Sequence, residues 1–303
     1  MARTSVENTV ERIRRQLAST VRLEISTLGS TLTTSTNPVT LTYDLPNSLR
    51  SGSVIAVGTE LMRVISVDTA AKECTVIRGW QDTDAQAHDT GAEVQINPRF
   101  TFADIYDAVI QEIDSWAPDI FKVEDDVFTT ADDTAGVEIP ADQSDILGVI
   151  SVNRNWTDDA SVVWPDTGFT LYRGRSASLT PDTGSGLFVR FTRNLGYAET
   201  GEVFITYAKP FDTSLLTFAG DFVTDLGMAT NQLEIVELGV KYRVLADDET
   251  GRSARGPQDE PRRAEEVQSG DVLTLAQTVL QRYNTRKAQE VRRLRSAYSF
   301  QTW

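Results

Sequence analysis

The chain has 303 residues, of which 40% are hydrophobic and 24% charged, the proportions of a globular protein rather than a disordered one. No stretch approaches the run of about 18 apolar residues that a membrane span requires, and the charged start MARTSVENTVERIRRQ does not resemble a signal peptide. Cys74 and His88 are the only cysteine and histidine, which excludes disulfides, Cys/His zinc sites and HExxH sites. We therefore expect no catalytic residue, no metal, no cofactor and no enzyme activity, in a protein made in the cytoplasm.

Charge is unevenly distributed along the chain. The net charge is −15, but residues 100–240 hold 24 acidic and 7 basic side chains, against 20 and 22 in the remainder. The stretch from Arg282 to Arg295 contains six basic residues, with Glu290 as its single acidic one. The middle of the chain should therefore repel polyanions, whereas its C-terminal part should attract an anionic partner.

Four segments have the three- and four-residue apolar spacing of amphipathic helices. They are residues 6–19, 101–118, 232–246 and 272–298. Thr4 with Glu7, and Thr101 with Asp104, have the spacing of a capping box at the first two helix starts. We expect the third helix to end within residues 247–251 and a linker rich in Arg, Pro and Gly to follow it.

Two blocks of short β-branched runs lie between the expected helices. In the first block, strands are expected at residues 54–57, 61–67, 74–78 and 94–96. In the second block, they are expected at residues 136–140, 146–153, 169–173, 187–193 and 203–209. Because turn residues separate the runs, the first block suits a small barrel or sandwich and the second a β-sandwich.

These elements predict an α+β fold: a helical bundle of N-terminal, central and long C-terminal helices, with a small β-barrel-like insertion and a β-sandwich domain. The expected segments are an N-terminal bundle helix (1–20), a small β module (21–97), a bundle helix (98–118), a β-sandwich domain (119–221), a further bundle helix (222–250), a linker (251–270) and a long C-terminal helix with its tail (271–303). The second half of the last helix is too polar to pack into its own subunit's core, so we expect it to meet a partner.

A sequence module lies between Gly52 and Val94, and reads GSVIAVGTELMRVISVD followed by CTVIRGWQDTDAQAHDTGAEV. Over about a seventh of the chain, it resembles a module that recurs in neck and tail proteins of tailed bacteriophages, with the pattern "vG-x-E-x-m-r-V" and then "V-x-R-G-x-x-G-T-x-x-x-x-H-x-x-G-x-x-V". The matching positions that we expect to maintain its structure are Gly58, Glu60, Arg63, Arg78, Gly79, Thr83, His88 and Gly91. Asp82 replaces the usual glycine before the threonine, so that turn is expected to differ.

The segment after the module, NPRFTFADIYDAVIQEIDSW, resembles a helix of the phage head-to-tail adaptor, or connector, family. The resemblance implies a virion structural protein in the neck between head and tail. In that family copies form a ring, typically a dodecamer, that docks on the portal protein, faces the tail with its β domains and surrounds a channel for DNA. It implies neither sequence-specific DNA binding nor a membrane partner.

The expected portal contacts lie at the C-terminal end of the chain. They are Arg282, Arg286, Lys287, Arg292, Arg293, Arg295, Tyr298, Phe300 and Trp303. The arginines suit an acidic protein surface, because a guanidinium grips a carboxylate at two points. In the middle of the chain, an acidic channel wall would let DNA slide past without adhering.

Other interpretations of the same residues remain open. A tail-completion or minor tail protein would use the same module. A carbohydrate-binding adhesin would use the aromatic residues Trp156, Trp164, Phe169 and Tyr172 as stacking surfaces. A hydrolase using two carboxylates is also conceivable, but no spacing singles out a pair.

Three local interpretations concern charged residues. His88 with Arg78 and Asp89 is either a catalytic cluster or, as we favour, a loop cap with a bracing arginine. Glu60 and Arg63 are expected to form a structural ion pair across a hairpin. The acidic pairs at 125–126 and 132–133 lack the alternation of a calcium loop and are expected to form solvated loops.

Overall fold

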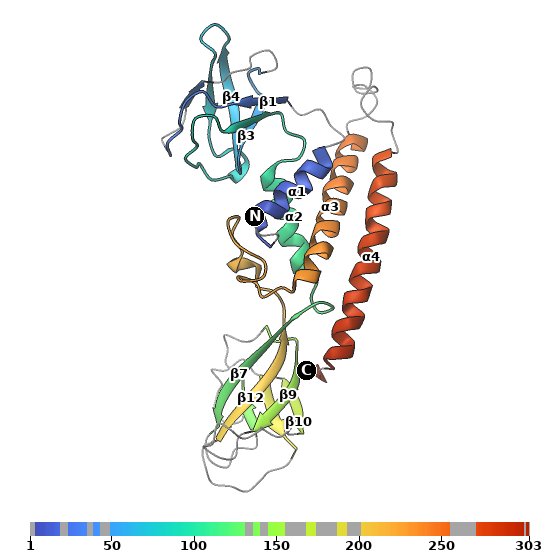
Figure 1. Cartoon of the computed structure of the whole chain (residues 1–303). Helices are drawn as coiled ribbons and strands as arrows, with labels where there is room; N and C mark the ends of the chain where they lie inside the picture. The colour runs from blue at the N-terminus through green and yellow to red at the C-terminus, as the bar shows by residue number, and fades with distance from the viewer. Residues whose placement is uncertain are drawn as a thin grey trace. The chain divides into compact units, whose positions relative to one another are not determined.

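The computed structural model describes residues 4–18, 24–34, 39–42, 49–130, 136–139, 145–154, 168–173, 187–192, 201–254, 271–299 and 301–302. The chain divides into two compact units (Figure 1). Unit 1 comprises Met1–Glu112, Leu216–Phe222 and Thr230–Asn284, and unit 2 comprises Ile113–Leu215, Val223–Ala229 and Thr285–Trp303.

The β module of unit 1 is an antiparallel six-stranded sheet in the order β1-β6-β3-β4-β5-β2. Its strands are β1 (Glu24–Thr27), β2 (Val39–Thr42), β3 (Val54–Val57), β4 (Glu60–Asp68), β5 (Glu73–Ile77) and β6 (Glu93–Ile96). The alternation along β5 buries Cys74 and Val76 and leaves Ile77 more exposed. The buried side chains of this and the other strands form one apolar core.

Three helices accompany this sheet in unit 1: α1 (Val6–Ala18), α2 (Phe102–Asp114) and α3 (Leu233–Ala254). The face of α1 that carries Val6, Val10 and Ile13 is fully buried. Arg12 on α1 forms an ion pair with Glu237 on α3. The polar side chains of α1 therefore help to fix its position against α3, although most of the free energy comes from its apolar face.

Unit 2 contains two antiparallel sheets that share one apolar core, as expected of a β-sandwich. One sheet has the order β10-β11-β8 and the other the order β13-β9-β12-β7. Their strands are β7 (Lys122–Thr130), β8 (Gly136–Glu138), β9 (Gly148–Arg154), β10 (Phe169–Arg173), β11 (Leu187–Phe191), β12 (Gly201–Lys209) and β13 (Gln301–Thr302). The longest pairing, between β12 and β7, is continuous from Gly201 opposite Thr130 to Lys209 opposite Lys122.

The C-terminal helix α4 (Asp271–Ala297) is the longest helix among the described residues. Its residues 271–284 are grouped with unit 1 and the rest with unit 2. Among the α4 residues whose burial is described, the buried ones are Ala276, Tyr283, Glu290 and Leu294. They are spaced at intervals of seven and four residues and therefore form a single narrow stripe. None of the described helices combines the length and the apolar character that crossing a bilayer demands.

The expected fold, a helical bundle with β insertions, is wrong. Among the described residues strands outnumber helices, and antiparallel sheets enclose an apolar core in each of the two units. The prediction overweighted the helices because a 3.6-residue period over four turns is conspicuous, whereas strands of four or five residues leave a weak pattern. The helices bury their apolar faces within unit 1, and Phe218 of a connecting segment contacts Phe102 and Tyr106 on α2.

Several boundaries also differ from the expectations. Helix α3 continues to Ala254, past the end expected at residues 247–251. Strands β1, β2, β7 and β13 were not predicted. Asp125 and Asp126 lie in β7 and not in a solvated loop, while the pair at 132–133 lies outside the described residues.

Candidate functional site

The motif residues of the β module meet in a buried ion pair. Glu60 is the first residue of β4 and Arg78 follows β5, and both side chains are completely buried. Arg78 Nε donates to Glu60 Oε1 at 2.8 Å and its Nη2 donates to Oε2 at 2.6 Å. The guanidinium also donates to the backbone carbonyls of Thr33 and Gln86. Arg78 thereby ties three separate segments of the module together.

The same carboxylate accepts three more hydrogen bonds. The backbone N–H of Gln86 donates to Oε2 at 3.0 Å and that of Gly79 to Oε1 at 3.4 Å. His88 Nε2 lies 2.9 Å from Oε2 and, because a carboxylate only accepts, carries the proton. Burial by itself raises the pKa of Glu60, but the hydrogen bonds from His88, Arg78 and Gln86 and the charge of Arg78 outweigh it and lower this pKa to about 2.

The turn after Arg78 depends on a glycine and a threonine. Gly79 has φ +62°, and a Cβ added there would lie 2.8 Å from the Thr83 carbonyl oxygen. Thr83 Oγ1 donates to the Trp80 carbonyl at 2.9 Å and accepts from the Leu61 N–H at 3.0 Å. A glycine is therefore required at the first position, and the threonine hydroxyl anchors the short helix η1 (Trp80–Asp82) to β4.

Two other motif glycines have left-handed backbone conformations. Gly58 has φ +58° in the turn between β3 and β4, and Gly91 has φ +85° in the turn before β6. His88 is connected to this region through its backbone, which exchanges hydrogen bonds of 2.7 and 2.9 Å with Leu32. These positions explain why the spacing of the motif has to be kept: it places the glycines in the turns and the polar side chains around Glu60.

The expected ion pair between Glu60 and Arg63 does not form. Arg63 is on β4 and exposed, and its guanidinium carbon lies 4.6 Å from the centre of the Trp80 ring. Neighbours on a strand point to opposite faces of the sheet, so the odd spacing of three residues puts Arg63 on the outer face and Glu60 inside. The sequence pattern gave no indication that Arg78 would take the place of Arg63.

The arrangement around Glu60 is typical of a structural brace. Each oxygen of Glu60 already accepts hydrogen bonds, and Arg78 has its donors occupied by Glu60 and two carbonyls. Asp89 is exposed, and no hydrogen bond joins its carboxylate to His88 in the part of the chain that the structure describes. The side chains of this cluster are therefore positioned to hold loops and not to receive a substrate.

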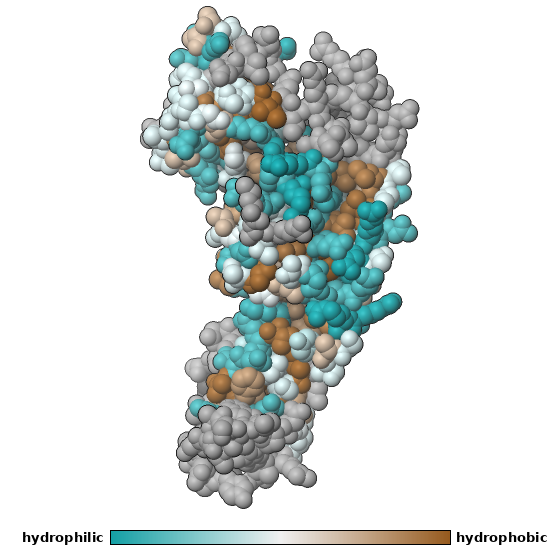
Figure 2. Space-filling view, viewed as in Figure 1, coloured by the Kyte–Doolittle hydropathy of each residue, from teal (hydrophilic) through white to brown (hydrophobic). Residues whose placement is uncertain are grey.

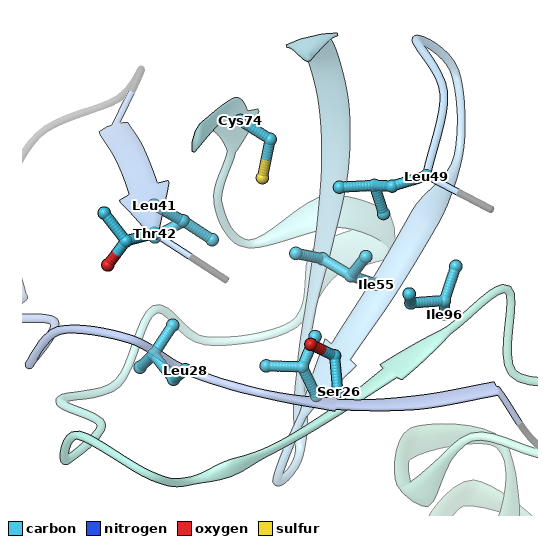
Figure 3. Close-up of a pocket in the computed structure, with 9 residues that line it drawn as sticks. Ser26, Leu28, Leu41, Thr42, Leu49, Ile55, Cys74 and Ile96 are labelled. Atoms are coloured by element: carbon cyan, nitrogen blue, oxygen red, sulfur yellow. The ribbon is translucent and has the colours of Figure 1, made fainter. Parts of the chain in front are cut away.

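A small apolar cavity lies in the core of the module. The side chains that surround it include those of Ser26, Leu28, Leu41, Ile55 and Cys74 (Figure 3). Its volume is about 10 Å³, room for roughly one water molecule. Burial raises the pKa of the Cys74 thiol to about 12, so the thiol stays protonated and unreactive. The cavity is an imperfection of packing and not a ligand site.

Several basic residues of α4 have partners within the chain. Arg293 pairs with Glu290 on its own helix and Arg295 pairs with Asp119 at 2.9 Å. Arg286 donates to the neutral Gln289. On the face of α4 visible in Figure 2, hydrophilic residues cover much of the C-terminal half.

The remaining basic residues of the expected portal site differ in exposure. Arg282 and Arg292 are exposed, and no ion pair to another described residue exists for either. Lys287 and Tyr298 are half-buried. Phe300 and Trp303 lie outside the described residues, while Gln301 and Thr302 between them form β13 on β9.

Of the four aromatic residues that an adhesin would use, the structure describes Phe169 and Tyr172. Trp156 and Trp164 lie outside the described residues. Phe169 is half-buried and packs on the core of the sandwich. In the described part of the chain, no group of three or more His, Cys, Asp or Glu side chains is arranged to hold a metal ion.

Comparisons with protein-family models, curated proteins and solved structures found no match to this chain.

Proposed function

We propose that this chain is the head-to-tail adaptor of a tailed bacteriophage, a virion structural protein that forms a ring between portal and tail. The proposal rests on the contacts that the motif residues make. Glu60, Arg78 and His88 are occupied by one another and by backbone groups, so the module that resembles phage neck proteins serves as a rigid scaffold. A scaffold of this kind suits a mechanical part whose task is to hold other proteins in place.

Helix α4 supports the portal as one partner. Arg292 is exposed and near the C-terminal end of a helix whose buried stripe is narrow. An acidic protein surface fits these arginines better than DNA, because the chain as a whole carries a net charge of −15. In the structure β13 lies on β9, so a tail that reaches the portal would first have to leave this sheet.

The acidic β-sandwich supports a channel that does not retain DNA. Glu124, Asp125 and Asp126 follow one another on β7. Burial raises the pKa of Tyr207 to about 12, and the charges of the nearby Glu124, Asp126 and Asp145 add to this shift. A surface of this sign repels phosphate groups. A ring structure in which these carboxylates all face away from the channel would contradict this part of the proposal.

The decisive experiment mixes the purified chain with the portal protein of the same virus and follows the product by sedimentation and negative-stain electron microscopy. We expect co-sedimentation and an added ring of density on the portal. The variant Arg292→Glu should weaken the complex, whereas Lys72→Glu, an equal change of charge at an exposed turn of the β module, should not. Unaltered sedimentation of both proteins would reject the adaptor role.

A further inference from the structure

A cavity of about 310 Å³ opens between α2 and α3 in unit 1. Three exposed carboxylates line it, those of Asp104, Asp107 and Asp247, with Arg99 as the one basic residue of the lining. Burial and the charge of Asp104 raise the pKa of Asp107. Neither Asp107 nor Asp247 forms an ion pair with another described residue. The lining therefore carries excess negative charge that an incoming cation would stabilise.

The inner wall of this cavity is apolar. Phe100, Ala108 and Val244 contribute buried side chains to it. The Arg99 guanidinium carbon lies 5.3 Å from the centre of the Phe100 ring, so this wall already accommodates a cation over an aromatic face. A long basic side chain suits such a lining, because its methylene groups cover apolar surface while its charged end reaches the carboxylates.

Helix α4 carries a complementary row of side chains, which we call the α4 arginine row: Arg282, Arg286 and Arg293. Successive residues of a helix are rotated by about 100° around its axis, so these three positions fall within an arc of about 40° around α4. Leu275, which is 43% exposed, lies on the same arc two turns earlier. Arg286 donates to the neutral Gln289, and Arg293 pairs with Glu290. Three arginines beside one carboxylate leave the row with a net positive charge.

A ring of identical copies needs two different, complementary surfaces on each copy, because every subunit contacts its neighbours head to tail. We propose that the α4 arginine row of one copy docks into the cavity between α2 and α3 of the next copy, with arginine gripping Asp104, Asp107 and Asp247. This inference rests on the proposed ring and specifies the interface within it. The planar guanidinium suits the site, because it binds carboxylates in pairs of hydrogen bonds.

Cross-linking tests this contact directly, because the only native cysteine, Cys74, is 2% exposed. The single variants Asp107→Cys and Arg286→Cys are mixed and oxidised, with and without the portal protein. We expect a disulfide-linked dimer from the mixture, and a ladder of multimers from the double variant. Replacing Arg286→Cys by Thr69→Cys, at an exposed turn of the β module, should give neither product.

Charge reversal provides the second test. Asp107→Arg and Arg286→Asp should each weaken self-association about tenfold or more, and mixing the two variants should restore it. Asp107 is exposed and Arg286 half-buried, and circular dichroism checks that each substitution leaves the fold intact. Cross-links no stronger than those of the Thr69→Cys control, with portal binding retained, would overturn this interface and leave the adaptor role standing. Loss of portal binding in the unsubstituted chain would instead reject the adaptor role itself.

Discussion

Gly239 on α3 lies directly against the carboxylate of Glu112 on α2. A Cβ added at Gly239 would be 2.3 Å from Glu112 Cδ, a distance that real side chains do not reach. Glu112 is 1% exposed and accepts from Arg243 Nε at 2.7 Å. The absence of a side chain at Gly239 is therefore what allows a buried carboxylate to connect α2 with α3.

Substitution of Gly239 should accordingly destabilise unit 1. In Gly239→Ala the methyl group displaces Glu112 from its ion pair, and we expect a loss of about 1 to 3 kcal/mol of unfolding free energy, typical of overpacking. Alanine is otherwise the better helix former, so an increase in stability would show that the contact is absent. Chemical denaturation measures the change, with the exposed Gln277→Ala on α4 as the neutral control.

Removal of the Glu60 charge should be among the most damaging single changes in the β module. Glu60→Gln leaves Arg78 charged and buried without its counterion, and such a loss costs about 3 to 5 kcal/mol. Glu73→Gln, at the half-buried start of β5, should cost less than about 1 kcal/mol. Equal melting temperatures for the two variants would contradict the role assigned to the ion pair.

The pH dependence of stability follows from the same carboxylate. The folded state lowers the pKa of Glu60 from 4.5 to about 2, so its contribution is complete above pH 4.5 and disappears as the pH falls toward 2. The shift corresponds to about 3 kcal/mol. The double variant Glu60→Gln/Arg78→Met lacks this contribution. Its stability should therefore fall less than that of the unsubstituted chain between pH 5 and pH 2.5, and parallel acid profiles would argue against the assignment.

Arg63 should behave differently from Arg78, although both belong to the same motif. Arg63→Ala removes a partly exposed contact with the Trp80 ring and should cost about 0.5 to 1 kcal/mol. Arg78→Ala leaves Glu60 buried without its counterion and should cost several times more. Comparable losses for the two variants, measured by thermal unfolding, would mean that Glu60 draws support from Arg63 as well.

The sequence predicted secondary structure better than it predicted architecture. Residues 54–57 and 169–173 were expected as strands and form β3 and β10 with the same bounds, and the four expected helices are all present. Strand β7 escaped prediction because Glu124, Asp125 and Asp126 interrupt any apolar alternation. Only pairing with β12 along its whole length makes this segment a strand.

The sequence predicted which residues form the cluster around Glu60, but not which of them pairs with Glu60. Glu60, Arg78 and His88 were singled out by the spacing of the motif, yet Glu60 was assigned to Arg63 because that residue is nearer in the sequence. The actual partner, 18 residues away, follows from the hairpin register that places Arg63 opposite Ile77 on the outer face. The cavity between α2 and α3 left no sequence signal, because Asp104, Asp107 and Asp247 meet only when the two helices pack.

Electron cryomicroscopy of the neck in an intact virion tests the central claim most directly. The adaptor role predicts a ring against the portal whose subunits each show the six-stranded sheet of unit 1, the two-sheet sandwich of unit 2 and the long helix α4. A portal-bound ring built from another protein, with this chain located elsewhere in the particle or missing from it, would contradict the account.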